Sequence, residues 1–95
     1  MPNAVNDNTK LNRYELEVDG MIAFVNYSRT AGVAAFIHAE VPHKLSGKGI
    51  GSTLARGALD LARAQGYKVI PRCSFIAAFI RKHPEFQGLV AEGAA

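Results

Sequence analysis

The chain has 95 residues, which suits one domain and is too short for two. Hydrophobic residues make up 48% and charged residues 20%, a globular composition that argues against a disordered chain. The single cysteine, Cys73, excludes an internal disulfide framework and a multi-cysteine zinc site, and the net charge of +3 comes from scattered basic residues that do not indicate a nucleic-acid-binding protein.

The first residues of the chain differ in character from the rest. Residues 1–10 are polar and lack periodicity, so they are predicted to be a flexible tail ahead of a single domain at 11–95. Residues 13–18 then alternate between polar and apolar side chains, which is the period of a half-buried strand.

Asp19-Gly20 predicts a two-residue hairpin turn into a second strand at 21–27, because both turn positions need positive φ angles. The hairpin register places six apolar residues on one face, as the pairs Val18 with Met21, Leu16 with Ala23 and Tyr14 with Val25. Ile22 and Phe24 make the other face of the second strand apolar as well. We therefore expect that strand to be covered on both faces.

A third strand is predicted at 33–41, after a loop at 28–32, and Pro42 ends it because proline has no N–H for the ladder. Side chains two residues apart on a strand share a face. The even positions of this strand are therefore expected to point to one side; they are Ala34, Phe36, His38 and Glu40.

Two helices and one strand are expected in the remainder. Apolar residues recur at helical spacing over 50–65, with Gly66 placed to end that helix. A short strand at 68–72 follows, and then a helix at 75–82 with Ser74 as its N-cap. No regular structure is predicted for 85–95. The element order is β-β-β-α-β-α, an α/β (α+β) fold with two helices on a mostly antiparallel sheet of about four strands.

The turn between the third strand and the first helix contains three alternating glycines, Gly47, Gly49 and Gly51. Glycine permits a tight turn and the close approach of an anion. The first amides of a helix have no intrahelical acceptor, and the helix dipole adds positive potential at this end. Lys44 and Lys48 add charge, so the turn predicts a phosphate or pyrophosphate site.

Two common phosphate-binding motifs do not fit this turn. The spacing G-x-x-x-x-G-K-[ST] of a P-loop is absent. In a dinucleotide-binding G-x-G-x-x-G fingerprint the third glycine comes one residue later than here, and an acidic residue should follow the next strand. A glycine-rich start of a helix without any ligand is the remaining alternative, but three glycines cost backbone entropy.

Val41-Pro42 followed by Gly-Lys-Gly-Ile-Gly-Ser-x-Leu resembles the main cofactor motif of the GNAT superfamily of N-acetyltransferases, [Gln/Arg]-x-x-Gly-x-[Gly/Ala]. Gly49 and Gly51 match the two small positions, while Ser46 stands where Gln or Arg is usual. Blocks at 38–42, 71–75 and 83–86 occur with this turn in the order of a small single-domain GNAT-like subfamily. The resemblance covers about residues 13 to 90.

This resemblance implies that the domain binds acetyl-coenzyme A. A metal site from His38, Glu40 and His83 is conceivable, but no ligand spacing supports it, so no metal is expected. The amides from Lys48 to Ser52 would hold the pyrophosphate, and the backbone around Glu40 and Val41 would hydrogen-bond the pantetheine arm. The expected cofactor-binding residues are Val41, Ser46, Gly47, Lys48, Gly49, Ile50, Gly51 and Ser52.

Three residues are candidates for the chemistry of acetyl transfer. Cys73 is expected at the start of the second helix, where the dipole favours a thiolate that can attack a thioester, and the resemblance points to the same residue; the alternative is a cysteine packed as a small apolar group. His38 and Glu40 share a face just before the glycine turn, and either can accept the proton of an amine. The alternatives are a core histidine and a surface glutamate.

The sequence therefore predicts an N-acetyltransferase that passes acetyl from acetyl-coenzyme A to an amine of a small molecule, a protein lysine or an N-terminus. A non-catalytic module that binds coenzyme A or an acyl-coenzyme A is the second hypothesis, and a small basic partner-binding protein is the third. We expect a cytoplasmic protein that binds no membrane, because no apolar stretch has the length of a signal peptide or a membrane span. We also expect a monomer or, through an exposed sheet edge, a weak homodimer, and no binding of nucleic acid, because the basic residues are scattered.

Overall fold

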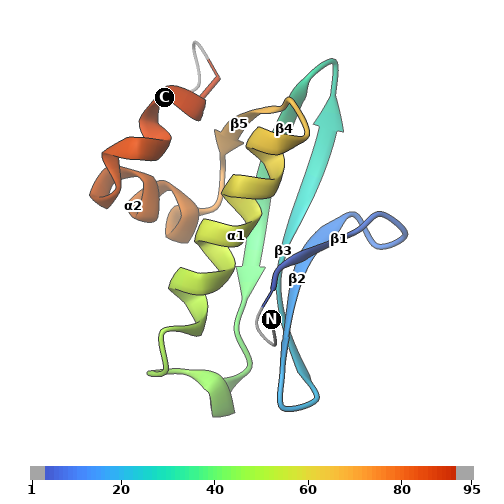
Figure 1. The fold of residues 1–95 in the computed structure, drawn as a ribbon, viewed down its shortest axis with the longest axis vertical. Coiled ribbons are helices and arrows are strands. Elements are labelled where there is room, and N and C mark those ends of the chain that lie inside the picture. The colour runs from blue at the N-terminus through green and yellow to red at the C-terminus, as the bar shows by residue number, and fades with distance from the viewer. Residues whose placement is uncertain (1–3, 92–95) are drawn as a thin grey trace.

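A computed structural model describes residues 4–91 of the chain. These residues form one five-stranded sheet with the strand order β1-β2-β3-β4-β5 (Figure 1). The strands are β1 (Asn6–Asn8), β2 (Arg13–Val18), β3 (Met21–Thr30), β4 (Val33–Glu40) and β5 (Lys68–Pro71). The first four strands are antiparallel to their neighbours, whereas β5 runs parallel to β4. The predicted mixed, mostly antiparallel α+β fold is confirmed, with one strand more than expected.

The hairpin between β2 and β3 has the predicted turn and register. Asp19 and Gly20 have φ angles of 54° and 78°, so both turn residues are left-handed. The three predicted apolar pairs are all present, and Tyr14, Leu16, Ala23 and Val25 are buried. The strand β3 is longer than predicted: it continues through the expected loop to Thr30 and turns only at Ala31 and Gly32.

The strand β1 lies where a flexible tail was predicted. Its Asp7 accepts hydrogen bonds from Tyr27 Oη (2.6 Å), Arg29 Nη1 (2.8 Å) and Gln65 Nε2 (2.9 Å). Burial raises the pKa of Asp7, but these hydrogen bonds and the charge of Arg29 outweigh it and hold the pKa below its ordinary value. Polar side chains thus attach this segment to β3 and to Gln65, so the prediction of a flexible tail was wrong for residues 6–8, while residues 1–3 lie outside the described residues.

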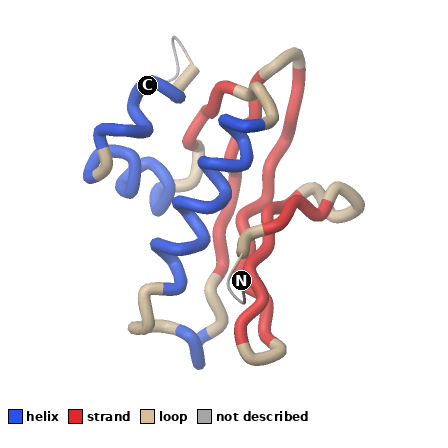
Figure 2. The backbone as a smooth tube through the Cα atoms, in the orientation of Figure 1, coloured by secondary structure: helices blue, strands red, loops and turns tan. Residues whose placement is uncertain are grey.

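Both helices follow β4 in the sequence: α1 spans Ile50–Ala64 and α2 spans Ser74–Lys82. Gly66, with φ of 86°, follows the end of α1 as predicted. The N-cap of α2 is Cys73 rather than Ser74. Short 3-10 helices, η1 (His43–Leu45) and η2 (Pro84–Leu89), stand before α1 and after α2; the second occupies part of the C-terminal segment for which no regular structure was predicted (Figure 2).

Side chains from β2, β3, β4 and both helices join in a single buried core between one face of the sheet and the helices. Its largest fully buried members include Tyr14, Phe36 and Phe86. Within residues 4–91, no helix has both the length and the apolar character needed to cross a membrane.

The other face of the sheet carries no helix among the described residues, and here the prediction for the second strand was wrong. Ile22 on β3 is 39% exposed and Ile37 on β4 is 48% exposed. The guanidinium of Arg13 lies over the ring of Phe24, 4.3 Å from the ring centroid. On this face a charged side chain, and not a helix, therefore shields part of the apolar surface from water. We call this side the open face.

Candidate functional site

The turn before α1 is built on left-handed glycines. Gly47 and Gly49 have φ angles of 80° and 74°, and Gly49 is the N-cap of the helix. A Cβ atom added at either glycine would meet no atom of the protein within 4 Å. The glycines are therefore required by the backbone conformation and not by packing, and the space beside them is open to a ligand.

The N-terminus of α1 offers amides that the described part of the protein leaves uncapped. The N-cap makes no side-chain hydrogen bond, and the first intrahelical bond runs from Thr53 N to Gly49 O (3.1 Å). The amides of Ile50, Gly51 and Ser52 come before that bond and so have no intrahelical acceptor. No acidic residue lies in the first turn. This arrangement suits an anion.

Two of the residues predicted for this turn use their side chains within the protein. The Ser46 hydroxyl donates to His43 O at 2.6 Å, and the side chain of Ile50 is buried in the core. Ile50 therefore offers a ligand only its backbone. Lys48 and Ser52 are exposed beside the open turn.

A β-bulge interrupts β4 at Ile37. Tyr27 of β3 pairs with Phe36, while its neighbour Asn26 pairs with His38, so Ile37 is the extra residue. One extra residue turns every later side chain to the opposite face. Ala39, opposite the buried Val25, packs against the core. His38 and Glu40 consequently point to the open face, so the prediction that they share a side with Ala34 and Phe36 was wrong.

The bulge leaves His38 and Glu40 together. His38 Nε2 and Glu40 Oε2 are 3.0 Å apart, and the side chains are 58% and 61% exposed. His38 is therefore not a core histidine. When Nε2–H donates to Glu40, the other ring nitrogen, Nδ1, is left as the proton acceptor, and the carboxylate stabilises the imidazolium that forms. Such a pair can accept the proton of an attacking amine.

The strands β4 and β5 stop pairing just before the bulge residue, Ile37. Their register runs from Val33 with Lys68 to Phe36 with Pro71. The last bond across this boundary runs from Cys73 N to Phe36 O (2.9 Å). In the described part of the chain, no strand pairs with the β5-side edge of β4 beyond Phe36. The N–H and C=O groups of an unpaired edge can hydrogen-bond an extended ligand.

Cys73 lies where β4 and β5 separate, but its side chain belongs to the core between the sheet and the helices. It is 8% exposed and belongs to the hydrophobic cluster, while its backbone forms the N-cap of α2. No hydrogen bond joins it to His38 or Glu40 among residues 4–91. The structure thus brings two of the three predicted catalytic residues together and places the third on the other side of the sheet.

Phe75 was not singled out by the sequence, although it lies over the glycine turn. It is 41% exposed, and a Cβ added at Gly51 would lie 3.0 Å from Phe75 Cζ. Gly51 therefore has a packing reason as well as its place in the motif, because it lets the first turns of α1 and α2 approach. An aromatic residue one turn after a strand gives no sequence signal of this contact.

His83 lies at the C-terminal end of α2. Its Nδ1 lies 2.8 Å from Phe79 O, and its ring stacks on the Phe79 ring at 3.9 Å between centroids. His83 therefore caps the C-terminus of α2. Within residues 4–91, no three His, Cys, Asp or Glu side chains are grouped as metal ligands would be.

Comparison with known protein families identifies the family of the chain. A family model described as GCN5-related N-acetyl-transferase matches residues 13–89, from the start of β2 to the end of η2. No curated protein matches the chain. The match covers well over half of the 95 residues and includes the turn, β4 and Cys73. The chain therefore belongs to the GCN5-related N-acetyltransferase family, whose acetyl donor is acetyl-coenzyme A.

Proposed function

We propose that the chain binds acetyl-coenzyme A with its pyrophosphate on the amides from Lys48 to Ser52 and transfers the acetyl group to an amine. The uncapped N-terminus of α1 supports this proposal most directly. It combines amides without intrahelical acceptors, the open space beside Gly47 and Gly49, and the absence of acidic residues from the first turn. A diphosphate needs all three properties.

The separation of β4 from β5 supports a place for the pantetheine arm. The arm carries amide groups, and the backbone edge from Ile37 to Val41 presents N–H and C=O groups that these can pair with. The edge leads from the bulge to the glycine turn, so one extended ligand can contact both.

When bound, acetyl-coenzyme A supplies a thioester carbonyl that an amine can attack. The task left to the protein is to remove the proton from the ammonium form of the acceptor. We assign this task to His38, with Glu40 orienting the ring through the 3.0 Å contact. Both side chains are exposed, so the proton passes from the pair to solvent.

Cys73 is the second candidate for handling the acetyl group. Its position at the end of the β4–β5 pairing favours a role as an acetyl carrier, whereas its 8% exposure favours packing. The intact mass of the wild-type protein and of Cys73→Ala after incubation with acetyl-coenzyme A separates these roles. A mass increase of one acetyl group in the wild-type protein but not in Cys73→Ala supports the role of Cys73 as an acetyl carrier. Unchanged turnover by Cys73→Ala refutes that role.

Calorimetric titration with coenzyme A tests the proposal as a whole. We expect saturable binding that weakens as salt is added, because the site holds an anion. If the titration shows no heat of binding at millimolar coenzyme A, the proposal is refuted. Binding without acetylation of any amine in a panel of small amines and peptides would instead identify the non-catalytic binding module.

A further inference from the structure

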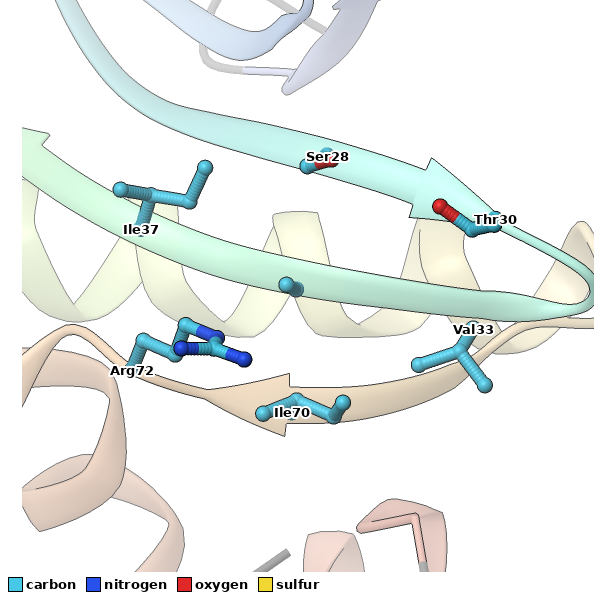
Figure 3. A pocket seen from close by; sticks show the side chains of 7 residues that line it. Ser28, Thr30, Val33, Ile37, Ile70 and Arg72 are labelled. Atoms are coloured by element: carbon cyan, nitrogen blue, oxygen red, sulfur yellow. The ribbon is translucent and has the colours of Figure 1, made fainter.

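The open face of the sheet contains a hollow of about 540 Å³. Figure 3 shows it with α1 behind the strands, so it lies on the side away from the helices. Val33, Ile37 and Ile70 give it an apolar floor, and Ser28, Thr30 and Arg72 add polar groups. A hollow of this size accommodates a small organic molecule.

One end of the hollow lies beside the proposed transfer site. In Figure 3, Arg72 and Ile37 lie together at one end, whereas Thr30 and Val33 lie at the other. Ile37 is the bulge residue immediately before His38, and Arg72 immediately precedes Cys73. A molecule seated in the hollow therefore reaches the place where β4 and β5 separate.

Among residues 4–91, Arg72 is the only charged residue that lines the hollow. Its side chain is exposed, and none of the ion pairs among residues 4–91 includes it. A guanidinium offers paired N–H donors that match the two oxygens of a carboxylate. Glu40, on the same face beyond Ile37, places a negative charge where an ammonium group would be attracted.

We propose that this hollow is the acceptor site and that it takes an apolar amino acid, with the carboxylate on Arg72, the side chain on the apolar floor and the amino group toward His38. This assignment rests on the proposed function for the reaction but not for the binding. In the reaction, the amino nitrogen bonds to the acetyl carbonyl carbon, the carbon–sulfur bond breaks, and the leaving sulfur takes the proton that the nitrogen loses as the amide forms, so coenzyme A leaves as its thiol. His38 takes the proton released by the ammonium group.

The binding test uses the full chain without cofactor and compares leucine with leucinamide, which has no carboxylate. Titrations followed by backbone NMR should show shifts at β4 and β5 with leucine, and leucinamide should bind at least tenfold more weakly. Arg72→Gln should weaken the binding of leucine about tenfold, so that leucine and leucinamide bind with equal affinity. The matched control, Arg81→Gln, alters an exposed arginine of α2 and should change neither affinity. Equal affinity of leucine and leucinamide for the wild-type protein would overturn the assignment.

Coenzyme A titration of the same variants separates this inference from the proposed function. Arg72→Gln should bind coenzyme A with wild-type affinity, because Arg72 lines the hollow on the open face and is not among the residues proposed to hold coenzyme A. If the protein binds leucine but does not bind coenzyme A, the proposed function is refuted and the hollow remains an amino-acid site. Acetylation of a peptide lysine in preference to leucine, with coenzyme A bound, would refute the acceptor assignment alone.

Discussion

Replacement of Gly49 by alanine separates the conformational role of this glycine from its role beside a ligand. The residue has a φ of 74°, and an added Cβ would meet no protein atom within 4 Å. The substitution therefore introduces backbone strain of about 1–2 kcal/mol without a clash. For a domain of this size, each kcal/mol lowers the melting temperature by about 4–8 °C.

The same methyl group should have a second effect, on coenzyme A. It would occupy the open space beside the helix amides and push the anion away from at least one of them. A hydrogen bond to a charged group contributes about 1.5–3 kcal/mol. Because 1.4 kcal/mol corresponds to a factor of ten in affinity, Gly49→Ala should lower the affinity for coenzyme A by about tenfold to a hundredfold.

Gly66 provides a matched control at the other end of α1. Its φ is 86°, and a Cβ there would also meet nothing within 4 Å. Gly66→Ala should therefore lose similar stability and keep its affinity for coenzyme A. Thermal unfolding and calorimetric titration of both variants check the two effects. Equal coenzyme A affinities in Gly49→Ala and Gly66→Ala would refute the placement of the pyrophosphate at this turn.

Three further substitutions test other parts of the structure. Gly57→Ala should destabilise the protein in urea unfolding, although alanine normally stabilises a helix interior by about 0.5–1 kcal/mol, because the new methyl would lie 2.7 Å from Val5 Cβ; Val5→Gly, which removes that Cβ, should relieve the loss. The pKa of Asp7 is lowered in the folded protein, so its stabilisation is complete above the unfolded value of about 3.9 and is lost as pH falls through the folded pKa. Asp7→Asn should therefore reduce stability at neutral pH and flatten its decline toward about pH 3, and parallel pH curves would contradict this. His38→Gln should lower kcat about 100-fold with unchanged coenzyme A affinity, and an unchanged kcat would exclude His38 as the base.

Elements governed by local rules could be predicted from the sequence. The Asp19-Gly20 turn and the register of its hairpin follow from the positive φ angles that the turn requires, and both are present. The glycine turn and the start of α1 at Ile50 were predicted from equally local features. The family resemblance rested on the same turn and is confirmed by the match over residues 13–89.

Features that depend on pairing between distant segments could not be predicted. No residue type in β4 marks Ile37 as a bulge, since the bulge arises only when the strand is paired with β3. Strict alternation therefore assigned His38 and Glu40 to the wrong face. The strand β1 escaped prediction for a related reason: Asp7 is held by hydrogen bonds to Tyr27 and Arg29, whereas hydrophobic patterning detects only apolar contacts.

The exposed sheet face follows from the size of the chain. A domain of this length buries a smaller share of its surface than a larger domain does, and the only two α-helices among the described residues form one core with a single face of the sheet. Apolar side chains such as Ile22 and Ile37 are then left on the other face. Because the bulge turns His38 toward that same face, an acceptor bound in the proposed site would meet the proposed proton acceptor directly. A domain with so few elements can therefore build an acceptor site from its sheet alone, without an added helix or loop to form the second wall.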